Sequence, residues 1–411
     1  MFYSYGHVTC IKISCLNDTK LHHSAKMPAN SSEIKNGKGN IISGYGCLWK
    51  VFKLFGIDVE SPSKCMREYT QRLYIYYSFG FFGFLSLCAA YSTTSMWAKT
   101  TNISTGLKIS FPVTLSNVLS TVLWIVLYKQ RSYLQITLVR MHSEAYPRFD
   151  KIRAINATLY SFCFFHIFYM LAWSFLMNET SEDMYYQLLL GYKLGNSCRI
   201  FANFLFLFAY CINVVFFPSL VAIALTSIYL HCKFLLSEYE QKIKSMSQCI
   251  VYAPVKLIRH YSRLLEVVGE LNGILSTPAF LVFILLSLEM FSCMAVVLLF
   301  DFDQKNIQRV FSSLVILTHN AIVFLWMVLI ASSVPAKMKV IRNHFSSMFE
   351  SLLYSSESDR DKLAIIRHAM SKETVSFSAC GMVKFSRKFI LSFFGGFLTY
   401  ALLFININNN R

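Results

Sequence analysis

The stretch FILSFFGGFLTYALLFINI occupies residues 389–407, near the carboxyl end of the chain. It contains no charged side chain, and its length is close to the ~20 residues that a helix needs to cross the hydrocarbon core of a bilayer. Gly395 and Gly396 lie in its middle, where the missing side chains let another backbone approach closely. The stretch therefore predicts a helix that spans a membrane.

Six further apolar stretches of spanning length precede it, at residues 73–96, 109–128, 155–177, 200–229, 278–300 and 310–334. The whole chain is 55% hydrophobic and only 15% charged, with a mean hydropathy of +0.45, which is too little charge to cover the surface of a soluble domain. We therefore predict an all-α membrane protein of seven transmembrane helices. Pro218 lies inside the fourth stretch and predicts a kink or a cytoplasmic extension there.

The orientation follows from the basic residues, because Lys and Arg concentrate in cytoplasmic loops. Of the 39 Lys and Arg, 32 fall in the N-terminal segment and the second, fourth and sixth connections, and 7 fall on the other side. This bias places the N-terminus in the cytoplasm and the C-terminus outside. The net charge of +17 then indicates loops beside anionic lipid, and no nucleic acid partner is expected.

The chain divides by composition into segments with different expected roles. Residues 1–40 are polar and predict a disordered cytoplasmic N-terminus. Residues 41–72 carry apolar side chains at helical spacing, which indicates an amphipathic segment either on the inner membrane surface or docked on the protein itself. Residues 73–334 hold helices 1–6 with a helical cytoplasmic fourth connection, residues 335–388 form a helical cytoplasmic connection, and residues 408–411 are an extracellular tail.

Asn102 and Asn178 begin sequons in predicted outer loops and are candidate glycosylation sites.

Polar side chains inside the predicted spans are the candidate functional residues, because such groups are expensive in lipid and tend to face the protein interior. Glu289, Asn213 and the pairs Ser116-Asn117 and His319-Asn320 lie near the middle of their spans. A set from three helices, in the outer half or near the middle of the membrane, predicts a ligand pocket of aromatic and polar groups: His166, Tyr169, Trp173, Asn203, Tyr210, Thr318 and His319. The alternative is that these groups form hydrogen bonds between helices and only hold the bundle together.

No catalytic motif is present in the chain: there is no nucleophile elbow, no P-loop and no H-E-x-x-H. The 12 cysteines are scattered, without C-x-x-C pairs or Cys/His blocks at metal spacing. We therefore expect neither an enzyme nor a metal or cofactor site, and no structural disulfide.

The carboxyl end resembles the insect gustatory receptor family. Ala379-Cys380-Gly381 matches the family's Ala-x-Gly block, and Thr399-Tyr400 followed by five hydrophobic residues matches the motif of its seventh helix. Asn406 stands where the family usually has Gln, and Ile407 stands where it usually has Phe. Both replacements keep the physical type, an amide followed by a bulky apolar residue.

This resemblance implies a plasma-membrane protein in which four seven-helix subunits, identical or related, surround a central pore. It implies a ligand-gated cation channel that senses a small-molecule tastant, for example a bitter or plant-derived compound. The seventh helix would line the pore, with Thr399, Leu403 and Asn406 on one helical face and Ile407 beside it.

Other classes of membrane protein stay open as alternatives. An insect odorant receptor shares the same inverted seven-helix plan, although the Thr399-Tyr400 motif favours the gustatory branch. A G-protein-coupled receptor would have its N-terminus outside, against the distribution of Lys and Arg. A secondary transporter would be expected to show internal repeats, and none is visible in the sequence.

Overall fold

The structure is a computed structural model of the chain. It describes residues 50, 52–53, 55, 57, 68–99, 103–143, 161, 164–165, 168, 208–209, 211–246, 254–299, 307–354, 360–371 and 374–409. The chain divides into two units, Met1–Gly39 and Asn40–Arg411. The first unit lies wholly outside the described residues, so everything below concerns the second.

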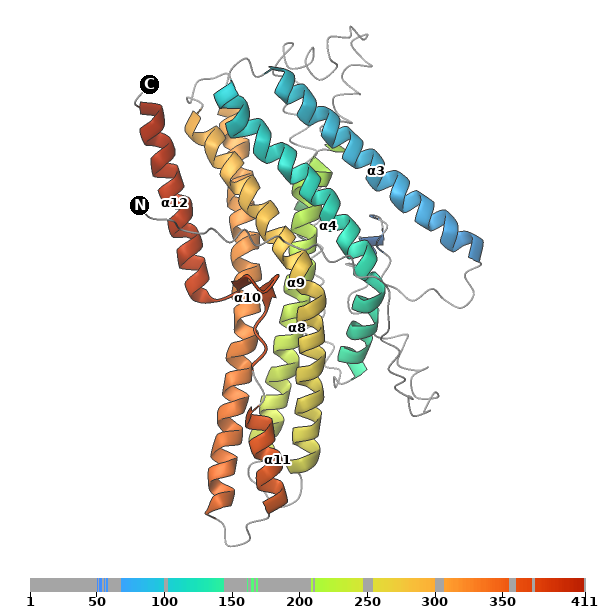
Figure 1. The fold of residues 1–411 in the computed structure, drawn as a ribbon, viewed down its shortest axis with the longest axis vertical. Coiled ribbons are helices and arrows are strands. Elements are labelled where there is room, and N and C mark those ends of the chain that lie inside the picture. Colours follow the sequence, from blue (N-terminus) through green and yellow to red (C-terminus); the bar gives the residue numbers. More distant parts are fainter. Residues whose placement is uncertain are drawn as a thin grey trace, which may run out of the picture. The chain divides into compact units, whose positions relative to one another are not determined.

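Helices dominate the described residues, and Figure 1 shows how they run beside one another. In chain order the elements are α3 (Glu68–Lys99), α4 (Ile103–Ser143), η1 (Cys211–Phe216), α8 (Phe217–Met246), α9 (Pro254–Leu299), α10 (Ile307–Leu353), α11 (Arg360–Ser371), strands β1 (Ser378–Ala379) and β2 (Val383–Lys384), and α12 (Arg387–Asn409). Six of the seven predicted spans coincide with these helices. The third span, 155–177, and the start of the fourth lie almost wholly outside the described residues, as do Asn102 and Asn178.

Four of the described helices are both long and apolar enough to cross a membrane: Phe111–Met141, Cys211–Ser245, Leu257–Leu298 and Val310–Ser351. The helices α9 and α10 contain 46 and 47 residues, which at 1.5 Å per residue is about 70 Å. That is more than twice the ~30 Å of a bilayer's hydrocarbon core. Both helices therefore continue well beyond the length that a bilayer's hydrocarbon core requires.

A π-helical turn, η1, precedes α8 at the position where the sequence predicts a kink. Pro218 has no N–H to donate to the carbonyl of Val214, and its ring would collide with that carbonyl in a regular α-helix. A wider turn relieves the collision, which accounts for the π-helix directly before Pro218. The irregularity lies within the fourth span, so it changes which side chains of that span face the other helices.

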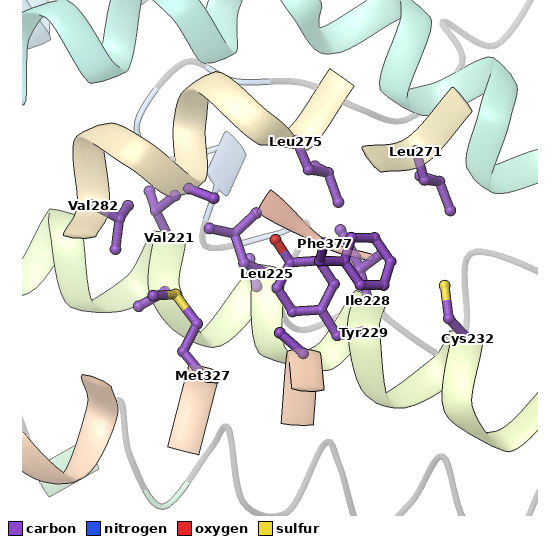
Figure 2. Close-up of a cluster of buried hydrophobic side chains, with 14 of the residues drawn as sticks. Val221, Leu225, Ile228, Tyr229, Cys232, Leu271, Leu275, Val282, Met327 and Phe377 are labelled. Atoms are coloured by element: carbon purple, nitrogen blue, oxygen red, sulfur yellow. The ribbon is translucent and has the colours of Figure 1, made fainter. Parts of the chain in front are cut away.

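The bundle is built around α8, α9 and α10, which pack on one another. Helix α4 lies along α9, α3 lies along α4, and α12 packs on α9 and α10 (Figure 1). Between the three central helices lies the apolar layer of Figure 2, in which every labelled side chain is buried. It comprises Val221, Leu225 and Tyr229 of α8, Leu275 and Val282 of α9, Met327 of α10, and Phe377.

The segment before α3 docks on the helices through its described residues. The side chains of Phe52, Phe55 and Ile57 are buried. Trp124 of α4 donates its indole N–H to the carbonyl oxygen of Phe55 at 2.7 Å, and the Phe55 ring lies 5.1 Å from that of Phe217 on α8. These contacts correspond to the second alternative for residues 41–72, a segment that packs on the protein itself.

A short hairpin connects α11 to α12, in a segment that the sequence predicts to be helical. Strands β1 and β2 pair antiparallel, and the turn between them holds Cys380 and Gly381 at positive φ angles of 50° and 69°. The hairpin attaches to α9: the backbone N–H of Ser378 donates to Oδ1 of Asn272 at 3.2 Å, and that of Cys380 donates to the carbonyl oxygen of Ser276 at 3.2 Å. The predicted helical connection over 335–388 thus contains this short hairpin after α11.

Candidate ligand site and pore helix

Two of the seven predicted ligand residues, Thr318 and His319, lie in the described part of the chain, both on α10. The hydroxyl of Thr318 is exposed and donates to the carbonyl oxygen of Leu314 on its own helix at 2.8 Å. His319 is half-buried, and its Nε2 lies 3.4 Å from Oγ of Ser219 on α8. His319 thus faces the contact between α8 and α10. The other five lie outside the described residues: His166, Tyr169, Trp173, Asn203 and Tyr210.

Asn213, in the π-helical turn, is the centre of a hydrogen-bonded group that joins η1 to α4. Its backbone carbonyl oxygen accepts from Oγ of Ser120 at 2.6 Å, and its Nδ2 donates to Oδ1 of Asn117 at 3.3 Å. All three side chains are buried. In the π-helical turn, the N–H group that would donate to the Asn213 carbonyl in a regular α-helix is displaced. The buried carbonyl therefore needs another donor, and the Ser120 hydroxyl supplies it. The turn before Pro218 therefore creates a polar contact in the middle of the bundle.

Three more buried polar side chains lie in the same part of the bundle, on α4, α9 and α10. Glu289 is 5% exposed, Ser116 is fully buried and Asn320 is 1% exposed. The Ser116 hydroxyl faces the Glu289 carboxyl. Within the described residues, however, Oε1 of Glu289, Oγ of Ser116 and both amide atoms of Asn320 make no hydrogen bond of good geometry. We call Asn213, Ser116, Asn117, Glu289 and Asn320 the polar layer.

The helix predicted to line the pore, α12, has one face that is packed against the rest of the chain. The ring of Phe393 lies 4.5 Å from that of Phe324 on α10. The rings of Phe397 and Tyr400 lie 5.1 Å and 4.9 Å from that of Phe291 on α9. Aromatic pairs at these spacings stabilise beyond the area that they bury. They fix the rotation of α12 about its own axis.

Another face of α12 is open. Thr399, Leu403 and Asn406 are all exposed, Leu403 by 56%, and the Thr399 hydroxyl donates only to the carbonyl oxygen of Gly395 in its own helix, at 2.9 Å. Ile407 lies in the last turns of α12, but its side chain is outside the described set. The three described pore candidates are thus exposed in the single chain, and their role in a pore stays a prediction.

Charged side chains beyond the apolar layer tie α8 to α10. The buried carboxylate of Glu240 accepts from Nζ of Lys244 at 2.6 Å and from Nζ of Lys337 at 2.8 Å. On the outside of the bundle, one guanidinium nitrogen of Arg140 on α4 contacts both oxygens of Glu270 on α9, at 2.7 and 2.8 Å. Sequence analysis did not single out the two ion pairs that join different helices, because their partners lie 97 and 130 positions apart in the chain.

Long apolar helices with buried polar groups between them define a multi-pass membrane protein. A family model described as 7tm chemosensory receptor matches residues 45–407. The chain belongs to this family. The match confirms the predicted resemblance to insect chemosensory receptors and the seven-helix membrane fold. The chain is therefore a multi-pass protein of the plasma membrane.

Solved structures of an insect olfactory receptor, OR5 from Machilis hrabei, have the same fold. The structure without a named ligand matches with a TM-score of 0.61, and that in complex with eugenol with a TM-score of 0.57. Each match has 14% sequence identity and covers 91% of this chain and 99% of the other. No curated protein sequence matches the chain.

Proposed function

We propose that the chain is a gustatory receptor that acts as a ligand-gated cation channel for a small-molecule tastant. The observation that carries this proposal is the division of α12 into a packed aromatic face and an open face with Thr399, Leu403 and Asn406. Polar groups on a membrane helix are expensive unless they face water or another protein surface. A pore between subunits, with α12 of each lining it, satisfies this requirement.

The gustatory assignment rests on the Thr399-Tyr400 motif. Within this motif, the ring of Tyr400 packs against that of Phe291 on α9. The olfactory receptor of the same fold supports a sensor of small molecules, since one of its two structures contains eugenol. At 14% identity they do not carry a ligand across to this chain. The proposed tastant is a bitter or plant-derived compound, because the described spans contain aromatic and amide groups without a dense cluster of carboxylates.

The proposed ligand pocket opens to the outside and is formed by His166, Tyr169, Trp173, Asn203, Tyr210, Thr318 and His319. The contact of His319 with Ser219 supports it, because this contact puts an imidazole at the boundary of two helices that a ligand could separate or draw together. In the proposed orientation, with the N-terminus in the cytoplasm, these residues lie in the outer half of the membrane.

The proposed gate lies near the outer end of α12. In a homotetramer or a heterotetramer with related receptors, four copies of Ile407 would form an apolar ring that excludes water, and a dry constriction blocks ions. The neighbouring Asn406 amide would replace part of a cation's hydration shell when the ring widens. The exposure of Asn406 in the single chain is consistent with this role.

Electrical recording tests the proposal most simply. Cells that express the chain are screened with bitter, sweet and volatile compounds. Outside-out patches are then excised, with a pipette solution that lacks GTP at the cytoplasmic face of the membrane. A channel responds to the activating compound with a cation current that persists in the excised patch. The proposal is wrong if surface-expressed protein responds only through a current that disappears once GTP is removed. Activation by volatile compounds alone would assign the chain to the odorant branch.

A further inference from the structure

The residues of the polar layer share one cross-section of the bundle, two helical turns from Val282 and Met327 at one end of the apolar layer of Figure 2. Val282 on α9 and Met327 on α10 lie on neighbouring helices in that layer. Glu289 lies seven residues after Val282, and Asn320 lies seven residues before Met327. Because α9 and α10 are antiparallel, both steps run about 10 Å in the same direction along the bundle and return to the same helical face.

The α4 side of this layer is placed by direct contacts. Ser116 faces the carboxyl of Glu289, and Asn117 accepts the hydrogen bond from Asn213. Helices α4, α9 and α10 and the π-helical turn thus each contribute a buried polar group to one cross-section of the bundle. A single polar residue in a span has many structural explanations, whereas the meeting of four elements indicates a built site.

Within the part of the bundle that the structure describes, the carboxyl of Glu289 has no Lys or Arg partner. Residues 109–124, 211–220, 282–296 and 313–327 contain neither Lys nor Arg, and Glu289 forms no ion pair within the described residues. An ionised carboxylate in such surroundings must gain a proton or a counter-charge, since a lone buried charge is very unfavourable. Among the described residues, three oxygen atoms in this cross-section make no hydrogen bond of good geometry, namely Oε1 of Glu289, Oγ of Ser116 and Oδ1 of Asn320.

We propose that the polar layer binds a monovalent cationic group, with Glu289 as its counter-charge and Ser116 and Asn320 as neutral oxygen ligands. Oxygen ligands suit hard cations, and the single carboxylate balances a single positive charge, whereas a divalent ion such as calcium takes six to eight oxygen ligands. The same chemistry fits a sodium ion from the outer solution or the protonated amine of a small molecule. The site is distinct from the proposed gate on α12.

The test uses purified full-length protein in lipid nanodiscs and measures its melting temperature. Chloride salts of sodium, methylammonium and the bulky N-methyl-D-glucamine are compared at equal ionic strength, so that general salt effects cancel. A cation that binds only the folded state raises the melting temperature as its concentration rises. We expect sodium or methylammonium to do so relative to N-methyl-D-glucamine. A shift with sodium assigns the site to the ion, and a shift with methylammonium alone assigns it to a ligand's amine.

Three variants give the result its specificity. Glu289→Gln keeps the shape and removes the charge, so the cation-dependent shift is lost. Glu266→Gln makes the same change at an exposed position of α9 and keeps the shift. If Glu289→Gln does not fold, Asn320→Leu serves instead, because it removes one oxygen ligand and strands no partner; it raises the half-maximal cation concentration about tenfold.

The proposal is overturned if no small cation shifts the melting temperature of the wild-type protein, because Glu289 would then carry only a proton. It is equally overturned if Glu289→Gln folds and keeps the full shift. Neither result depends on gating, since binding is measured without current. A failure here therefore leaves the proposed channel function standing, and an absent current leaves this site standing.

Discussion

The apolar and polar layers share the helices α9 and α10, along which Val282 and Met327 lie two turns from Glu289 and Asn320, and the layers differ in how completely their side chains are satisfied. In the apolar layer the rings of Tyr229 and Phe377 lie 4.3 Å apart and both are almost wholly buried. In the polar layer Glu289 and Asn320 are as deeply buried but have polar atoms without partners in the described chain. The side chains of both layers are deeply buried. Those of the apolar layer are fully packed, whereas those of the polar layer are incompletely hydrogen-bonded.

This difference indicates which layer serves stability and which serves function. A buried polar atom without a partner costs about 1–3 kcal/mol relative to a bonded one. A sequence selected only for stability would fill these positions with apolar side chains, as it does one layer away. The polar layer therefore has the character of a site that a ligand or ion completes.

Breaking the apolar layer should have the largest effect. Tyr229→Ala removes a fully buried ring that packs on Phe377 of the hairpin segment, and we expect a loss of about 3–5 kcal/mol in the free energy of unfolding. The protein should then largely fail to reach the cell surface, as measured by surface biotinylation. The matched change Tyr133→Ala, at an exposed position of α4, should leave the surface amount nearly unchanged. Equal surface amounts for the two variants would contradict a structural role for this layer.

The open face of α12 provides the next test, since Thr399, Leu403 and Asn406 are exposed there in the single chain. Ile407→Ser should wet the proposed gate and give a constitutive cation current without ligand. Substitution of Asn406 should shift the relative permeability of cations. Ile405→Ser, elsewhere on the same helix, is the control and should give no leak. Surface-expressed Ile407→Ser with neither leak nor altered selectivity would show that the pore is not built at this position.

Two buried asparagines of the polar layer sharpen the comparison by smaller effects. Asn213→Leu removes the amide that donates to Oδ1 of Asn117 and accepts from Oγ of Ser120, and should destabilise the protein by about 1–3 kcal/mol. Asn320→Leu strands no described partner, so in N-methyl-D-glucamine chloride its melting temperature should equal or exceed that of the wild type. Thermal melting of both variants in nanodiscs measures the difference. An equal loss for both would mean that Asn320 has a structural partner after all.

The sequence predicts the spans well because length and hydrophobicity are local properties. The bounds of α12 fall within two residues of the apolar stretch 389–407, and Pro218 marks the irregular turn. The sequence also singles out Glu289 and Asn320 as polar groups inside spans. That they share one cross-section depends on how α9 and α10 are aligned against each other, which no local pattern specifies.

The sequence predicts neither the hairpin nor the aromatic face of α12, and the two reasons are related. Each strand has only two residues, too short for an alternating pattern, and Gly381 was the single local sign of a turn. The rings of α12 recur at helical spacing in a helix that is apolar almost all round, so periodicity does not distinguish the face that packs from the face that stays open.

The central claim is that the proposed pocket around His319 binds the ligand while the apolar layer stabilises the fold. One pair of concentration–response curves tests this claim most directly. His319→Ala and Val282→Ala are compared, each with the first compound that activates the wild type and each normalised to the number of receptors at the surface. The account predicts that His319→Ala keeps its surface number and needs about tenfold more ligand, a change of about 1.4 kcal/mol, whereas Val282→Ala loses surface number and keeps its potency. Unchanged potency with reduced surface expression for His319→Ala would contradict it, because that residue would then serve packing alone.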